Sequence, residues 1–168
     1  MRNPFLIDVG EQLRHPGTRR AVVRAAPLPG LALSTTRVPD DAEVEADLVV
    51  EAQGTTVIVA GTARAPWVGE CRRCLGPTHG EFTVDIHEIF EPDPVDGETF
   101  PLEGEVVDLA PMLRESVALA LPLAPLCRED CAGPDPEDHP VLTPGDGDEA
   151  GPPADPRWAA LDELRFDA

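Results

Sequence analysis

Apolar and polar residues alternate along two neighbouring stretches of the chain, 43–52 and 55–65. In the first stretch the odd positions are mostly acidic and the even positions are apolar: Val44, Ala46, Leu48 and Val50. A period of two places successive side chains on opposite faces of a strand. Because Gln53-Gly54 between the stretches is typical of a turn, the pattern predicts an antiparallel hairpin with one buried face.

Shorter apolar patterns predict further strands at 18–25, at 81–90 and at 106–107. In 81–90 we expect Phe82, Val84 and Ile86 to face inward, together with Ile89 and Phe90. Residues 4–9 form an extended start, which a small amphipathic piece at 10–14 follows. The acidic stretch 91–105 contains Pro and Gly and is predicted to be a loop.

One helix is predicted after residue 108. Asp108 is a good N-cap and Pro111 suits a first turn. The apolar residues then recur at helical spacing up to Pro122: Leu109, Met112, Leu113, Val117 and Leu121. The predicted fold class is therefore α+β, mainly antiparallel β with one principal helix.

The chain is predicted to divide into three segments. Residues 1–132 would form a single β-rich domain. Residues 133–155 are acidic and rich in Pro and Gly, so we expect a disordered linker that buries too little surface to fold. Residues 156–168 are expected to form a short helix whose apolar stripe would bind a partner: Trp158, Leu161 and Leu164.

Charge is distributed unevenly along the chain. The formal net charge is −19, and all thirteen basic residues are Arg. Such a charge argues against general nucleic-acid binding. Residues 1–37, however, carry six Arg against Asp8 and Glu11, a local charge of about +4. This arm could contact RNA through Arg14, Arg19, Arg20 and Arg24, or it could be a strand pair with a solvated face.

No apolar run reaches the roughly 18 residues of a membrane helix, and the first residues lack the apolar core of a signal peptide. The expected location is cytoplasmic. There, cysteines are more often thiols or metal ligands than disulfides.

Four cysteines form two close pairs, Cys71/Cys74 and Cys127/Cys131. The first pair falls between two predicted strands, as in a zinc knuckle, and the second follows the predicted helix. Both spacings suit tetrahedral zinc, and four protein ligands would make the site structural. Neighbouring arginines favour the thiolate form: Arg72, Arg73 and Arg128.

Two alternatives to this ligand set stay open. His139 could replace one thiolate. The cysteines could also be redox thiols, although a redox Cys-x-x-Cys usually opens a helix rather than joining two strands. No phosphate loop, nucleophile elbow or His-Glu-x-x-His segment is present, so the sequence predicts a protein that is not an enzyme.

The order of several motifs resembles the YceD family, the large ribosomal RNA subunit accumulation proteins. These motifs occur here at Pro4–Val9, Val59–Thr62, Glu70–Pro77, Val107–Leu109, Leu119–Cys127 and Asp155–Leu161. The resemblance implies a bacterial cytosolic protein with the four cysteines as metal ligands. Where many members carry a third cysteine pair, this chain continues with 132–139 and has none.

The expected function is a non-enzymatic ribosome-biogenesis factor with a structural zinc site. Its expected partners are large-subunit ribosomal RNA or its precursor particle, met through the arm and through Arg72 and Arg73, and a basic ribosomal protein. The alternative is an acidic adaptor or chaperone that binds a basic ribosomal protein without contacting RNA.

Overall fold

The computed structural model describes residues 3–138. Within them the chain forms eight strands and two helices in this order: β1 (Leu6–Asp8), α1 (Gly10–Arg14), β2 (Arg19–Pro27), β3 (Thr36–Arg37), β4 (Glu43–Gln53), β5 (Thr56–Glu70), β6 (Pro77–Glu91), β7 (Phe100–Glu103), β8 (Val106–Asp108) and α2 (Leu109–Ala120).

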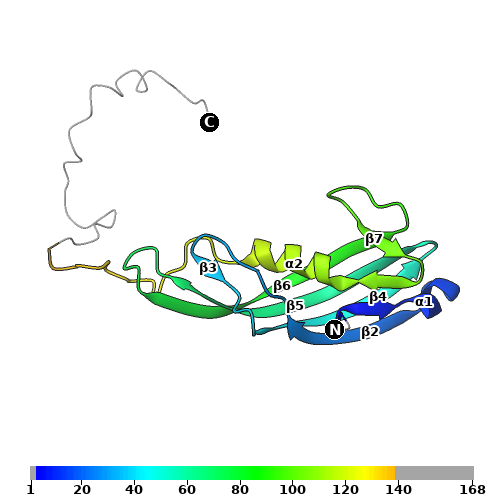
Figure 1. Cartoon of the computed structure of the whole chain (residues 1–168), viewed down its shortest axis with the longest axis horizontal. Coiled ribbons are helices and arrows are strands. Elements are labelled where there is room, and N and C mark those ends of the chain that lie inside the picture. Colours follow the sequence, from blue (N-terminus) through cyan, green and yellow to red (C-terminus); the bar gives the residue numbers. More distant parts are fainter. Residues whose placement is uncertain (1–2, 139–168) are drawn as a thin grey trace, which may run out of the picture.

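The strands form one curled, half-barrel sheet in the order β1-β8-β7-β6-β5-β4-β2, and β3 pairs with β5 beside it. Neighbouring strands are antiparallel except for the short parallel pairing of β6 with β7. Helix α2 lies across one face of this sheet (Figure 1). Strands β5 and β6 are the longest strands and form a hairpin. They pair from Val57 opposite Phe90 to Glu70 opposite Pro77.

The hairpin predicted from residues 43–65 is confirmed. Strand β4 alternates between exposed and buried positions along its length, and Leu48 is paired with Gly61 of β5. Its buried side chains are those that the period of two selects: Val44, Ala46, Leu48, Val50 and Ala52. The acidic side chains of β4 face outward, which keeps their charges in water.

Strand β6 follows its predicted pattern with one exception. Ile86 and Phe90 are buried, but Ile89 is exposed. Adjacent residues of a strand point to opposite faces, so Ile89 and Phe90 cannot both face the core.

The predicted fold class, α+β, is wrong, because the structure is mostly β. Strands account for 46% of the structure and helices for 12%. Alternation continues through β5 and β6, which are 15 residues long each. The stretch 91–105, predicted as a loop, supplies the short strand β7, and β3 lies at 36–37, for which the pattern predicts no strand. A single helix of 12 residues therefore packs on a sheet that contains several times as many residues as the helices.

Helix α2 begins and ends as predicted. The Asp108 side chain accepts a hydrogen bond from the backbone N–H of Ala110 at 2.9 Å, and Asn3 donates to the same carboxylate. Apolar side chains of α2 are buried against the sheet: Leu109, Met112, Leu113 and Val117. Pro122 has no backbone N–H with which to continue the helix, and α2 ends at Ala120.

Two predictions fall on residues that the structure does not describe. The linker predicted at 133–155 extends past residue 138, and the helix predicted at 156–168, with Trp158, Leu161 and Leu164, lies wholly outside. Among the described residues, no helix has the length and apolarity that a membrane span requires.

Candidate metal centre

The first cysteine pair sits in the tight turn that joins β5 to β6. The backbone N–H of Cys71 donates to the carbonyl of Gly76 at 2.8 Å, and the N–H of Leu75 donates to the carbonyl of Cys71 at 2.9 Å. Leu75 adopts a left-handed φ of 58° to close the turn. The turn therefore places Cys71 and Cys74 on one side of the hairpin tip.

The segment after α2 carries the second pair to the same tip. Thr36 and Thr35 donate hydroxyl hydrogen bonds to the carbonyls of Pro122 and Leu123, at 2.9 and 3.2 Å. The backbone N–H of Arg72 then donates to the carbonyl of Pro125 at 2.9 Å. These bonds guide the chain along β3 toward the end of the β5–β6 hairpin (Figure 1).

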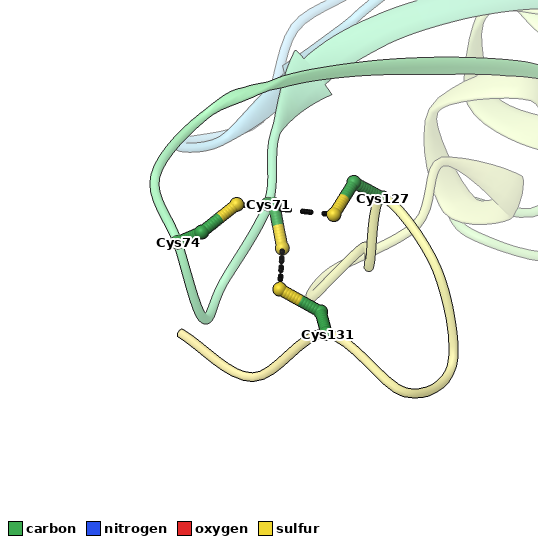
Figure 2. Close-up of side chains that lie close together, drawn as sticks. All are labelled: Cys71, Cys74, Cys127 and Cys131. Atoms are coloured by element: carbon green, nitrogen blue, oxygen red, sulfur yellow. Dashed lines mark hydrogen bonds between the residues drawn. The ribbon is translucent and has the colours of Figure 1, made fainter. Parts of the chain in front are cut away.

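The four sulfurs converge on one point (Figure 2). All of them lie within 4.8 Å of one another. The Sγ atoms of Cys71 and Cys131 are 3.8 Å apart, as are those of Cys74 and Cys127. A tetrahedral ion about 2.3 Å from each sulfur would set the sulfurs about 3.8 Å apart. The arrangement is therefore compatible with a metal ion bound by four thiolates.

Each cysteine pair supplies one buried cysteine and one that is more exposed. Cys71 and Cys131 are buried, Cys74 is half-buried and Cys127 is exposed. The two 3.8 Å sulfur contacts each join a cysteine of the first pair to a cysteine of the second. An ion at the centre would therefore tie the hairpin tip to the segment after α2.

Hydrogen bonds give the thiols of the centre unequal acidity. Backbone hydrogen bonds at Cys74 and Cys127 lower the pKa of the Cys71 thiol to about 6. The backbone N–H of Arg73 also points at this sulfur, 3.5 Å away. For Cys127, the hydrogen bond with the Cys131 sulfur raises the pKa to about 12. The Cys71 thiolate is thus favoured at neutral pH, whereas Cys127 would need a nearby cation to lose its proton.

Arg73 joins the two halves of the centre. Its Nη1 donates to the backbone carbonyls of Glu129 at 3.1 Å and of Cys131 at 2.9 Å. The sequence predicts RNA contact and thiolate stabilisation for Arg73, and carries no signal for these bonds. Arg72 beside it is exposed, and none of the side-chain bonds described for residues 3–138 involves its guanidinium.

The arginines predicted to contact RNA at 14–24 lie away from the cysteine centre, whereas Arg37 of β3 pairs with Val68 close to it. Arg19 pairs in register with Glu51, which is opposite Ile58 near the start of β5. The turn that holds Cys71 and Cys74 follows Glu70 at the other end of β5. That end is about 40 Å from Ile58 along an extended chain. The fold therefore separates the arginines at 14–24 from Arg72 and Arg73.

Each of the four arginines predicted to contact RNA at 14–24 has an intramolecular partner. Arg14 and Arg19 form ion pairs with Glu105 and Glu51, at 2.8 and 2.6 Å. Arg20 and Arg24 donate to the backbone carbonyls of Asp8 and Val23. Surface ion pairs of this kind contribute about 0–1 kcal/mol, so a phosphate could displace them. RNA binding by these arginines stays a prediction, and His139 lies outside the described residues.

The fold and the centre define a class: a mostly β domain whose longest hairpin shares a four-cysteine cluster with the segment after its helix. The chain belongs to the family described as "Large ribosomal RNA subunit accumulation protein YceD", whose model matches residues 59–165. The matched region contains all four cysteines and α2.

Several mycobacterial proteins are similar to the chain along most of its length. Uncharacterized proteins of Mycobacterium tuberculosis and Mycobacterium bovis are each 34% identical over 172 residues, covering 96% of this chain and 82% of theirs. An uncharacterized protein of Mycobacterium leprae is 32% identical, covering 96% of this chain and 78% of its own. No solved structure matches the chain.

Proposed function

We propose that the protein is a non-enzymatic factor that supports the accumulation of large-subunit ribosomal RNA in the cytoplasm. The observation that carries this proposal is the family match across residues 59–165. The family's description names an RNA-accumulation role and no reaction, and the four-cysteine cluster supports a structural part within that role.

The metal that we propose for the cysteine centre is zinc. Zinc favours four thiolate ligands in tetrahedral geometry, and the 3.8 Å sulfur separations suit it. With all four positions taken by Cys71, Cys74, Cys127 and Cys131, no site is left for a substrate. When bound, the ion would supply a cross-link between the hairpin tip and the segment after α2.

Large-subunit ribosomal RNA or its precursor particle is the partner that the family description favours. Within the chain, Arg72 is the arginine best suited to a phosphate, because its guanidinium is exposed at the hairpin tip. The arm arginines would act as a second, separate contact: Arg14, Arg19, Arg20 and Arg24.

A second candidate function is an acidic adaptor that binds a basic ribosomal protein and does not touch RNA. The net charge of −19 favours it, since such a surface repels phosphate and attracts basic segments. RNA binding that falls steeply with salt would support direct RNA contact. Absence of RNA binding, beside tight binding to a basic ribosomal protein, would support the adaptor.

The zinc proposal is tested by elemental mass spectrometry of protein purified without added metal. We expect one zinc per wild-type chain and less in Cys71→Ser, with Ser116→Ala as a control on a hydroxyl remote from the centre. Wild-type protein without zinc would overturn the structural-zinc proposal. Loss of zinc on mild oxidation, with disulfides formed, would instead support the redox alternative.

The ribosomal proposal is tested in cells that lack the protein. We expect the ratio of large- to small-subunit ribosomal RNA to fall, and to recover with the wild-type chain. Sedimentation at low salt should place the protein with large-subunit precursor particles. An unchanged ratio in the deletion strain would overturn the proposal.

A further inference from the structure

A pocket of about 550 Å³ lies between β6, the loop after it and the second half of α2, on the face of the sheet that α2 covers. Glu88 of β6 and Glu115, Ser116 and Leu119 of α2 line it, together with the loop that leads into Phe100. Its volume falls within the range of pockets that bind ligands. The pocket is separate from the cysteine centre, whose residues do not line it.

Glu88 occupies an unusual place for a carboxylate. It lies between Ile86 and Phe90 on the core-facing side of β6, and both of these neighbours are buried. Its partner in register on β5 is Val59, which is fully buried. The alternation of buried and exposed positions along β6 therefore predicts an apolar residue at 88. A half-buried carboxylate there costs stability that an apolar side chain would not cost.

Among the described residues, no ion pair compensates the charge of this carboxylate, and only the neighbouring His87 acts against the rise in its pKa. None of the five ion pairs within residues 3–138 includes Glu88 or Glu115. Partial burial, and then the negative charge of Glu115, raise the pKa of Glu88 above its ordinary value. The loop adds Asp96 and Glu98, and no cationic residue lines the pocket.

The loop that walls the pocket is internally bonded. The Thr99 hydroxyl donates to the Glu91 carboxylate at 2.7 Å and accepts from the backbone N–H of Val95 at 2.7 Å. The backbone N–H groups of Glu98 and Thr99 both donate to the carbonyl of Val95. The wall is therefore formed before any ligand arrives, which lowers the entropic cost of binding.

The pocket also presents apolar surface beside its carboxylates. Leu119 of α2 lines the pocket with 81% of its surface exposed, and Phe100, whose ring centroid lies 5.4 Å from that of Phe90, lines it too. Lysine and arginine side chains combine a long aliphatic stem with a cationic head, and such a mixed surface suits them. A free metal ion would gain nothing from contact with the apolar surface of the pocket, and a phosphate would be repelled by its carboxylates.

We propose that this pocket docks a lysine- or arginine-bearing segment of a protein partner, with a cationic group between Glu88 and Glu115 and its stem against Leu119. The inference rests on the proposed function only for the expectation that the partner is a ribosomal protein. The chain's own residues 139–168 are a poor occupant, because they carry seven acidic residues against two arginines.

The test uses the full-length chain and a short fluorescein-labelled peptide of alternating arginine and leucine, with binding followed by fluorescence anisotropy. The pocket variant is Glu88→Gln/Glu115→Gln. The matched control is Glu43→Gln/Asp85→Asn, which removes two carboxylates from the outward face of the sheet. We expect the pocket variant to bind about tenfold more weakly and the control to bind like the wild type.

Equal weakening in both double variants would overturn the proposal, because the peptide would then sense only net charge. Absence of binding to the wild type would overturn it too. Displacement of the peptide by Mg²⁺ or spermidine, with ionic strength held constant by NaCl, would assign the pocket to a small cation instead.

Two further measurements separate docking from a structural role. The glutamine variant should unfold at the same temperature as the wild type or a higher one, because like-charge repulsion is removed. If the glutamine variant does not fold, Leu119→Ser tests the same pocket without changing a carboxylate. Leu123→Ser is its control, because Leu123 is equally exposed. We expect only Leu119→Ser to weaken binding of the peptide. Equal weakening by the two serine substitutions would overturn the proposal. Since ribosomal RNA ratios are measured separately, failure here leaves the proposed function standing.

Discussion

The sheet face under α2 and the cysteine centre both hold together segments that are distant in sequence, but they do so by different physical means. Under α2, Phe5, Phe90, Leu113 and many other apolar side chains form one continuous buried core. At the cysteine centre, Cys71 and Cys131 are buried but stand outside that core. A few hydrogen bonds and the four sulfurs hold this end.

The difference implies two kinds of stability. Burial of apolar surface acts on the whole domain and needs no ligand. A site held by thiolates that repel one another when charged depends on the cation between them. We therefore expect the core to set whether the chain folds, and the centre to set whether the hairpin tip and the segment after α2 stay joined.

The largest effect should come from the core. Leu113→Ala removes a fully buried side chain between α2 and the sheet, and we expect the free energy of unfolding to fall by about 3–4 kcal/mol. Urea denaturation measures it, with and without zinc. Leu119→Ala is the control, since that leucine of the same helix is exposed. A loss confined to the zinc-loaded protein would contradict the division between the two regions.

The next effect should come from removing the metal. With free zinc at about 100 times its dissociation constant, binding would stabilise the wild type by about 2.7 kcal/mol, and Cys71→Ser should lose this increment. In the absence of zinc the two proteins should differ far less. Hydrogen exchange should accelerate at the turn 71–76 and at 122–131 and stay slow in β4. Uniform acceleration would show that the centre stabilises the whole domain.

A smaller effect should separate two neighbouring arginines. Arg73→Ala removes the side chain that joins the first cysteine turn to the carbonyls of Glu129 and Cys131. We expect about a tenfold loss of zinc affinity, as for other groups that position metal ligands. Arg72→Ala keeps its backbone bond to Pro125 and should leave zinc affinity unchanged. Competition with a chromogenic chelator measures both, and equal losses would assign the effect to positive charge alone.

The sequence predicted most of the core because its signal is local. The alternation at 43–52 specifies the buried face of β4 residue by residue, and Asp108 with Pro111 specifies the start of α2. The fold class was missed because β3 and β7 are too short to carry a pattern. Strand β3 has only two residues and pairs with β5 where Gly69 allows close approach to Thr35.

At the cysteine centre the sequence predicted which residues would meet, but not what aligns them. The spacing of the four cysteines suggests one ion, and their sulfurs do converge. The Arg73 bonds span 56 and 58 residues and end on backbone carbonyls, which carry no side-chain signal. Glu88 did leave a signal, because it interrupts the apolar series Phe82, Val84, Ile86 and Phe90.

The smallest predicted effect concerns the turn that builds the first half of the centre. Leu75 is a non-glycine residue at a φ of 58°, and a left-handed conformation costs an L-residue roughly 1–2 kcal/mol. Its side chain is 69% exposed, so little packing offsets that cost. Leu75→Gly should remove the strain but increase the entropy of the unfolded chain, for a net gain of about 0.5–1 kcal/mol in the zinc-loaded protein.

Leu123→Gly is the matched control. That leucine is 80% exposed and has no positive φ, so glycine there should only lower stability. Thermal unfolding of the zinc-loaded variants measures both effects. If Leu75→Gly is destabilising like Leu123→Gly, the exposed Leu75 side chain must hold the turn through contacts that outweigh its backbone strain. The hairpin tip would then be stabilised by apolar packing, like the face under α2, and the contrast between the two regions would narrow.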